Sequence, residues 1–137
     1  VLILVVLALI AWGGAAGIFD QKKSQNRLKI AVLCTTSLLA DAAREVGGDK
    51  IEIKALMGPG VDPHLYRARE SDIQALLRAD IIFYHGLHLE GKMGELLERM
   101  KSWKPVVAVG DSIARGDLLQ SEFDDIYDPH IWHDVSL

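Results

Sequence analysis

Residues 28–64 read LKIAVLCTTSLLADAAREVGGDKIEIKALMGPGVDPH, and their pattern indicates the fold class. Residues 28–33 are apolar except for one lysine, as in a strand buried on both faces of a parallel sheet. Residues 35–37 offer hydroxyls that cap a helix over 38–46, and the glycine pair that follows would end it. Residues 51–57 alternate apolar and polar side chains, which predicts a second strand.

The alternation of strand and helix continues beyond this stretch. Residues 71–78 predict a short helix capped by Ser71, and residues 81–84 predict a third strand. Residues 89–101 form an amphipathic helical pattern, and residues 105–109 predict a fourth strand. Short strand–helix–strand connections produce right-handed parallel sheets. We therefore predict an α/β fold with a parallel four-stranded sheet flanked by helices.

The sequence GPGVDPH, which ends at His64, follows the second predicted strand, and Asp128-Pro129-His130 repeats its last three residues. Proline holds φ at about −65° and biases the preceding residue toward extended geometry, so each histidine leaves a stiff turn. In open α/β sheets, ligands bind outside the carboxyl ends of the strands. Because neutral imidazole is the commonest metal ligand, His64 and His130 are candidate metal ligands. The alternative is two ordinary Asp-Pro turns that are each followed by a histidine.

Five motifs occur in one order along the chain. They are GPGVDPHLY (58–66), SDI (71–73), ADIIFY (79–84), GLHLE (86–90) and DPHIW (128–132). Together they resemble the zinc/manganese substrate-binding proteins of bacterial ABC transporters, the TroA-like group of metal-binding lipoproteins and adhesins. The similarity runs from Lys29 to Leu137.

The resemblance implies the N-terminal lobe of a two-lobed metal-receptor fold, whose cleft holds zinc or manganese through four side chains. His64 and His130 match the first and second ligands of the family. The third and fourth ligands, a His or Glu and an Asp or Glu, belong in the family to a C-terminal lobe that we expect to lie outside this sequence. We therefore expect the N-terminal half of an exported binding protein, not an enzyme, which delivers the metal to an ABC permease in the inner membrane.

The start of the chain is apolar. Residues 1–19 carry no charge and predict a signal peptide or an N-terminal membrane anchor. Residues 20–27 are polar and predict a linker, and we expect residues 28–137 to form the metal-binding lobe. Cys34, the single cysteine, lies inside the first predicted strand, where we expect a buried thiol rather than a lipid attachment site. We expect the protein in the periplasm or at the outer face of the cytoplasmic membrane, with membrane contact only through an uncleaved leader.

The composition excludes one class of partner. The net charge is −4, and no basic stripe interleaved with aromatic residues occurs, so nucleic acid is not an expected partner. Half of the residues are apolar and a quarter are charged, which is ordinary for a globular domain.

Other histidines and acids have more modest expected roles. We do not expect His85 or His88 to bind metal, and we expect a supporting or surface role for His133. Asp62 either accepts the ring N–H of a ligating histidine or simply forms its turn. The acidic run that comprises Asp124, Asp125 and Asp128 is typical of a solvated loop.

Two other functions use the same residues. An exported metal-dependent hydrolase would combine His64 and His130 with Asp62 or Asp128 and a metal-bound water as nucleophile. A surface adhesin would use the metal only to stabilise its structure.

Overall fold

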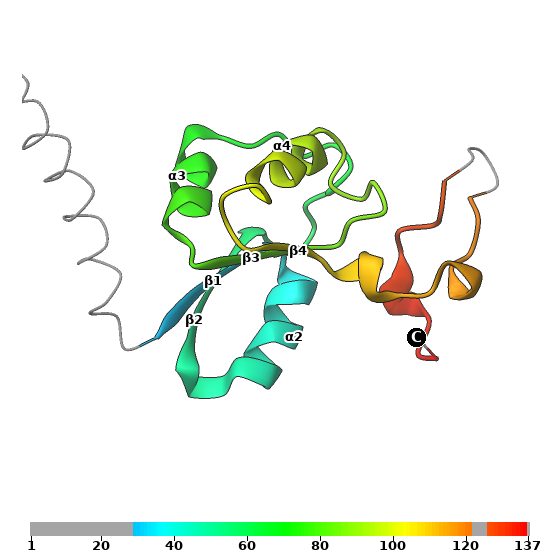
Figure 1. Cartoon of the computed structure of the whole chain (residues 1–137), viewed down its shortest axis with the longest axis horizontal. Helices are drawn as coiled ribbons and strands as arrows, with labels where there is room; N and C mark the ends of the chain where they lie inside the picture. The colour runs from blue at the N-terminus through cyan, green and yellow to red at the C-terminus, as the bar shows by residue number, and fades with distance from the viewer. Residues whose placement is uncertain (1–28, 122–125, 137) are drawn as a thin grey trace, which may run out of the picture.

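The computed structural model describes residues 29–121 and 126–136. Four parallel strands form one sheet in the order β2-β1-β3-β4 (Figure 1). The strands are β1 (Ile30–Thr36), β2 (Ile51–Met57), β3 (Ile81–Tyr84) and β4 (Val106–Ala108). The predicted parallel four-stranded α/β sheet is therefore confirmed.

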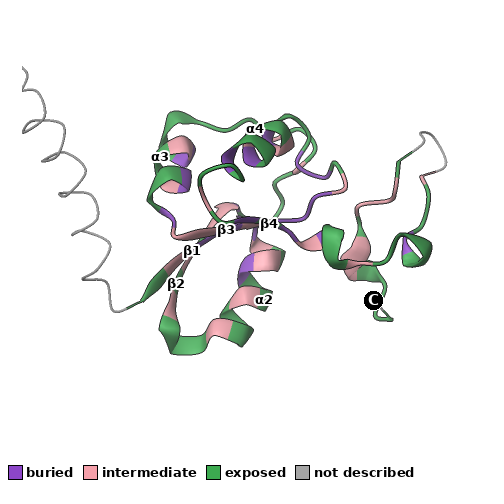
Figure 2. Ribbon diagram, in the orientation of Figure 1, coloured by how far each residue is buried: buried purple, intermediate pink, exposed green. Residues whose placement is uncertain are grey.

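Helices cover both faces of the sheet. Helix α2 (Ser37–Gly47) lies on one face, and helices α3 (Glu70–Arg78) and α4 (Lys92–Met100) lie on the other (Figure 1). Figure 2 shows buried residues in the inner part of the sheet and on the sides of α3 and α4 that face it, whereas β2, at one edge, is mostly intermediate or exposed. Because every strand runs in the same direction, all carboxyl ends meet at one edge of the sheet.

Alternate residues of β1 enter two separate cores, as the twofold period of a strand requires. Leu33 packs with residues of α3 and α4, whereas Val32 and Cys34 pack with residues of α2. Cys34 is fully buried, as predicted, and burial raises the pKa of its thiol to about 11. A protonated thiol in this position acts as a small apolar side chain.

Helix α2 (Ser37–Gly47) extends one residue beyond the predicted range, 38–46, at each end. The Thr36 hydroxyl accepts a hydrogen bond from the Leu39 N–H at 3.3 Å and so caps the first turn. Gly48 ends the helix with φ 54°, a left-handed conformation that glycine adopts without steric cost.

The other two helix starts differ from the prediction. Helix α3 begins at Glu70 and is not capped by Ser71; the buried Asp72 carboxylate instead accepts the Arg69 N–H at 2.8 Å. Helix α4 begins at Lys92 rather than at residue 89, because the chain between β3 and α4 first makes turns with positive φ at Leu87 and His88.

The predicted leader and linker, residues 1–19 and 20–27, lie outside the described residues. Within the part of the chain that the structure describes, no helix has the length and apolar character needed to cross a bilayer.

We expect Asp72→Ala to lower the free energy of unfolding by about 1–3 kcal/mol, because Asp72 accepts both the Tyr66 hydroxyl at 2.7 Å and the Arg69 N–H. Burial favours a higher pKa for Asp72, but these hydrogen bonds outweigh it and the pKa lies below its usual value. The stabilisation is therefore present at neutral pH and is lost as the pH falls through the Asp72 pKa. Urea denaturation at pH 7 measures it, with Glu70→Ala, an exposed carboxylate of the same turn, as the control. Equal losses in the two variants would contradict the assignment.

Candidate metal centre

The two histidines predicted as ligands lie together in the structure. His64 lies in the loop after β2, and His130 follows it by 66 residues, yet their Nε2 atoms are 3.5 Å apart. The ring centroids are separated by 5.5 Å, and both side chains are solvent-exposed. The fold therefore brings two imidazole nitrogens to one point on the surface.

The two Asp-Pro-His triplets have the same local geometry. Asp62 accepts the backbone N–H of His64 at 2.9 Å, and Asp128 accepts the backbone N–H of His130 at 2.9 Å. A side-chain oxygen that bonds the backbone two residues further on forms a tight turn, and the proline between them stiffens it. Of the two roles considered for Asp62, turn formation is the one that the contacts show.

Asp128 makes a second contact that Asp62 does not make. Its Oδ1 atom lies 2.6 Å from His130 Nδ1. The backbone N–H of His130 and then its ring hold the pKa of Asp128 below its usual value. An ionised carboxylate at Nδ1 assigns the proton to that nitrogen and leaves a lone pair on Nε2, which faces His64. The Asp128 side chain is 45% exposed, as expected for a solvated loop, but it also contacts the His130 ring. Asp124 and Asp125 lie outside the described residues.

The separation of the two Nε2 atoms suits a shared metal. Two Zn–N bonds of about 2.0–2.1 Å at a tetrahedral angle place the nitrogens about 3.3 Å apart. The observed 3.5 Å differs from that value by only a few tenths of an ångström. Among residues 29–121 and 126–136, no group of three or more His, Cys, Asp or Glu side chains is placed to hold a metal ion. Among the described residues, the pair could therefore hold a metal ion through two nitrogens.

The remaining histidines occupy different environments. His88 is exposed and lines a groove of about 600 Å³ together with both members of the pair. His133 is exposed beside Trp132, with ring centroids 5.5 Å apart, in agreement with the expected surface role.

His85 is buried directly behind the site. Its Nε2 atom lies 2.9 Å from the Thr36 hydroxyl, and its ring meets Trp132 edge-on at a centroid distance of 4.9 Å. Trp132 in turn meets His130 edge-on at 5.3 Å, so one indole separates a buried imidazole from an exposed one. Burial and then the positive charge that His130 can carry lower the pKa of His85 to about 4, so its ring is neutral at pH 7.

Sequence reasoning assigned no function to Glu90, which is almost completely buried. It accepts hydrogen bonds from residues at the ends of β1 and β3. The signal available in the sequence was its position: a carboxylate directly after the apolar Leu89, between a strand and a helix.

The chain is similar to proteins of one known family. The profile of the family described as zinc-uptake complex component A, periplasmic (ZnuA), matches residues 32–137. The chain belongs to this family. The resemblance predicted from the five sequence motifs is therefore confirmed.

Two relatives illustrate the similarity. The manganese-binding lipoprotein MntA of Bacillus subtilis is 42% identical over 80% of this chain and 36% of its own length. The zinc-binding protein TroA of Treponema pallidum is 42% identical over 96% of this chain and 42% of its own length. The chain thus spans less than half the length of these relatives.

Solved structures of the family share the fold. The periplasmic zinc-binding protein TroA from Treponema pallidum matches with a TM-score of 0.74 and 44% identity, over 79% of this chain and 39% of that chain. A manganese-bound periplasmic metal-binding protein from Candidatus Liberibacter asiaticus matches with a TM-score of 0.67 and 28% identity, over 79% and 40% of the two chains.

We expect the buried His85 to make the metal-free protein less stable in mild acid. Its pKa falls from 6.5 to about 4 on folding, so between these pH values the unfolded chain binds a proton that the folded chain excludes. Stability is therefore complete above pH 6.5 and decreases toward pH 4, by an amount on the order of 3 kcal/mol.

Urea denaturation between pH 7 and pH 4.5 measures this loss. His85→Gln, which retains a polar group near Thr36, should show a smaller decrease, whereas His133→Gln should behave as the wild type. A His85→Gln variant with the wild-type pH dependence would show that His85 does not cause the loss.

Proposed function

We propose that this chain provides half of the metal-binding site of an exported receptor, which captures zinc or manganese and delivers it to an ABC permease. The observation that carries this proposal is the approach of His64 Nε2 to His130 Nε2 at 3.5 Å. The relatives support the transport role, since several are named as metal or manganese ABC transporter substrate-binding lipoproteins, among them PsaA of Streptococcus pneumoniae.

Metal capture follows from the hydrogen bonds around the pair. The Asp128 carboxylate holds the proton of His130 on Nδ1, which makes Nε2 both available and more basic. Stiff Asp-Pro turns hold both rings before the ion arrives, so little conformational entropy is lost on binding. A receptor binds and releases its cargo without activating a water molecule, so its metal site has no need of an open position for catalysis.

The described residues do not select the metal. Imidazole suits zinc well, and the general order of affinities places Zn²⁺ above Mn²⁺ at the same ligands. Selection of manganese would therefore depend on the geometry and the oxygen content of the groups that complete the coordination. We propose that those groups lie outside the described residues.

The contacts of the two aspartates disfavour the hydrolase. That hypothesis needs Asp62 or Asp128 as a ligand or base, but each carboxylate is engaged with the backbone of its own turn. Asp128 also holds the His130 ring. Binding, rather than hydrolysis, is the chemistry that this arrangement supports, and the names of the relatives give no support to the hydrolase.

We place the protein in the periplasm or at the outer face of the cytoplasmic membrane. The family description is periplasmic, and the relatives include lipoproteins. The apolar residues 1–19 support export from the sequence side.

We expect His64→Ala and His130→Ala each to weaken zinc and manganese binding by at least about 100-fold, because each removes one of the two converging nitrogens. This effect is measured by calorimetric titration of the intact natural protein with each metal. His133→Ala, which removes an exposed imidazole three residues from His130, is the control and should bind as the wild type does. Wild-type affinity in both ligand variants would refute the proposed site.

A further inference from the structure

We propose that Glu90 is a positioning residue for the two histidines His64 and His130, and that it sets their separation through the turn formed by residues 85–91. This inference rests on the proposed function, since it concerns the geometry of the same site.

Glu90 joins the ends of two strands. Its Oε1 atom accepts the Thr35 hydroxyl at 2.8 Å and the His85 N–H at 2.7 Å, and Oε2 accepts the Gly86 N–H at 3.2 Å. Thr35 lies near the carboxyl end of β1, and His85 follows β3 directly. With 1% of its surface exposed, Glu90 makes these bonds away from water, where losing one is costly.

The turn that Glu90 holds has a strained backbone. Leu87 and His88 have φ values of 50° and 66°, a left-handed conformation that is unfavourable for residues with a Cβ atom. Within the turn, the Leu89 N–H bonds the Gly86 carbonyl at 3.0 Å, and the Gly91 N–H bonds the His88 carbonyl at 3.1 Å. Such a conformation persists only when the surrounding contacts fix it, and Glu90 supplies three of those contacts.

One end of the turn lies against His64. A Cβ atom added to Gly91 would lie 2.7 Å from the His64 carbonyl oxygen, so the backbone of the turn and the backbone of His64 are in close contact. A displacement of the turn would therefore move the first histidine.

The other end of the turn lies behind His130. The His85 ring supports Trp132 at 4.9 Å, and Trp132 supports the His130 ring at 5.3 Å. The same seven-residue segment thus contacts one histidine through its backbone and the other through an indole. Metal–imidazole binding tolerates changes of only a few tenths of an ångström in the distance between the metal and the nitrogen. A turn that is held in place therefore favours metal binding.

Glutamine cannot replace Glu90 without a conflict. Three donors converge on the carboxylate, and the amide of glutamine would present its own NH₂ group to at least one of them. Glu90→Gln therefore removes a hydrogen bond and the negative charge while keeping the shape of the side chain.

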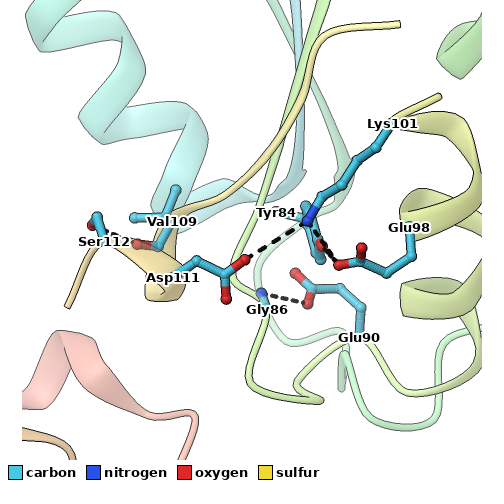
Figure 3. A network of polar contacts seen from close by, with 8 residues as sticks. All are labelled: Tyr84, Gly86, Glu90, Glu98, Lys101, Val109, Asp111 and Ser112. Carbon is cyan, nitrogen blue, oxygen red and sulfur yellow. Dashed lines mark hydrogen bonds and ion pairs between the residues drawn. The ribbon is translucent and has the colours of Figure 1, made fainter. Parts of the chain in front are cut away.

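Helix α4 provides a matched control. Figure 3 shows Glu98 on this helix beside Glu90, with its carboxylate directed at Tyr84 and Lys101. Glu98 accepts the Tyr84 hydroxyl and the Lys101 ammonium, at 2.9 Å for the latter, and so anchors groups other than the turn. Glu98→Gln makes the same chemical change close by and should leave the site intact.

The test uses the intact natural protein. Competition titration measures its affinity for Zn²⁺, and the visible spectrum of bound Co²⁺ reports the geometry of the ligands. We expect Glu90→Gln and Thr35→Val to weaken Zn²⁺ binding by about 10–100-fold and to shift the visible absorption bands of bound Co²⁺. Glu98→Gln and Thr35→Ser, which keeps the hydroxyl, should match the wild type in both measurements. The Co²⁺ bands report ligand geometry, so a general loss of stability would not shift them in protein that remains folded.

The outcomes separate this inference from the proposed function. A wild-type affinity and Co²⁺ spectrum in Glu90→Gln would overturn the positioning role, as would equal changes in Glu98→Gln. If Glu90→Gln does not fold, Thr35→Val decides by the same criteria, because it retains the charge and removes one donor. Metal binding that is absent in the wild type, or unaffected by His64→Ala and His130→Ala, would overturn the proposed function itself.

Discussion

The parallel pairing of all four strands is the constraint on which the site depends. It places the carboxyl ends of the strands at one edge, where the loop after β2 carries His64 and the residue after β3 is His85. An antiparallel strand would send one of these segments to the opposite edge. At the shared edge, buried polar groups must find partners, and the Glu90 carboxylate and the Thr36 hydroxyl meet this need with bonds that also order the turns. The same bonds therefore stabilise the fold and order the segments that lie beside His64 and His130.

Local patterns in the sequence were sufficient for most of the fold. The apolar run of β1, the alternation in β2 and the hydroxyl cap of α2 act over a few residues, so they predict elements directly. The two helix starts that were wrong depended on other interactions. Helix α3 is capped by a carboxylate inside its first turn, and the start of α4 is delayed by a turn whose left-handed residues, Leu87 and His88, are not glycine.

The site was predictable in part. The repeated Asp-Pro-His triplet identified His64 and His130, because proline and the preceding aspartate determine a turn locally. The 3.5 Å contact between residues 66 apart could not be derived, since it depends on strand order and on the path of the chain after β4. The burial of Glu90 escaped prediction for the same reason, because it depends on tertiary packing, which composition and spacing do not encode. The contact of Asp128 with the His130 ring is local, but the same triplet at Asp62 does not make it, so the triplet alone does not determine it.

We propose that the Nε2 atoms of His64 and His130 share one metal ion while Asp128 keeps the proton on His130 Nδ1. Long-range ¹H–¹⁵N correlation spectra of the histidine rings during a zinc titration test this proposal, because they report the protonation and metal binding of each nitrogen. We expect the Nε2 signals of His64 and His130 to shift to metal-bound values at the same zinc ratio, while Nδ1 of His130 stays protonated. Binding through Nδ1, or a shift confined to one of the two rings, would contradict it.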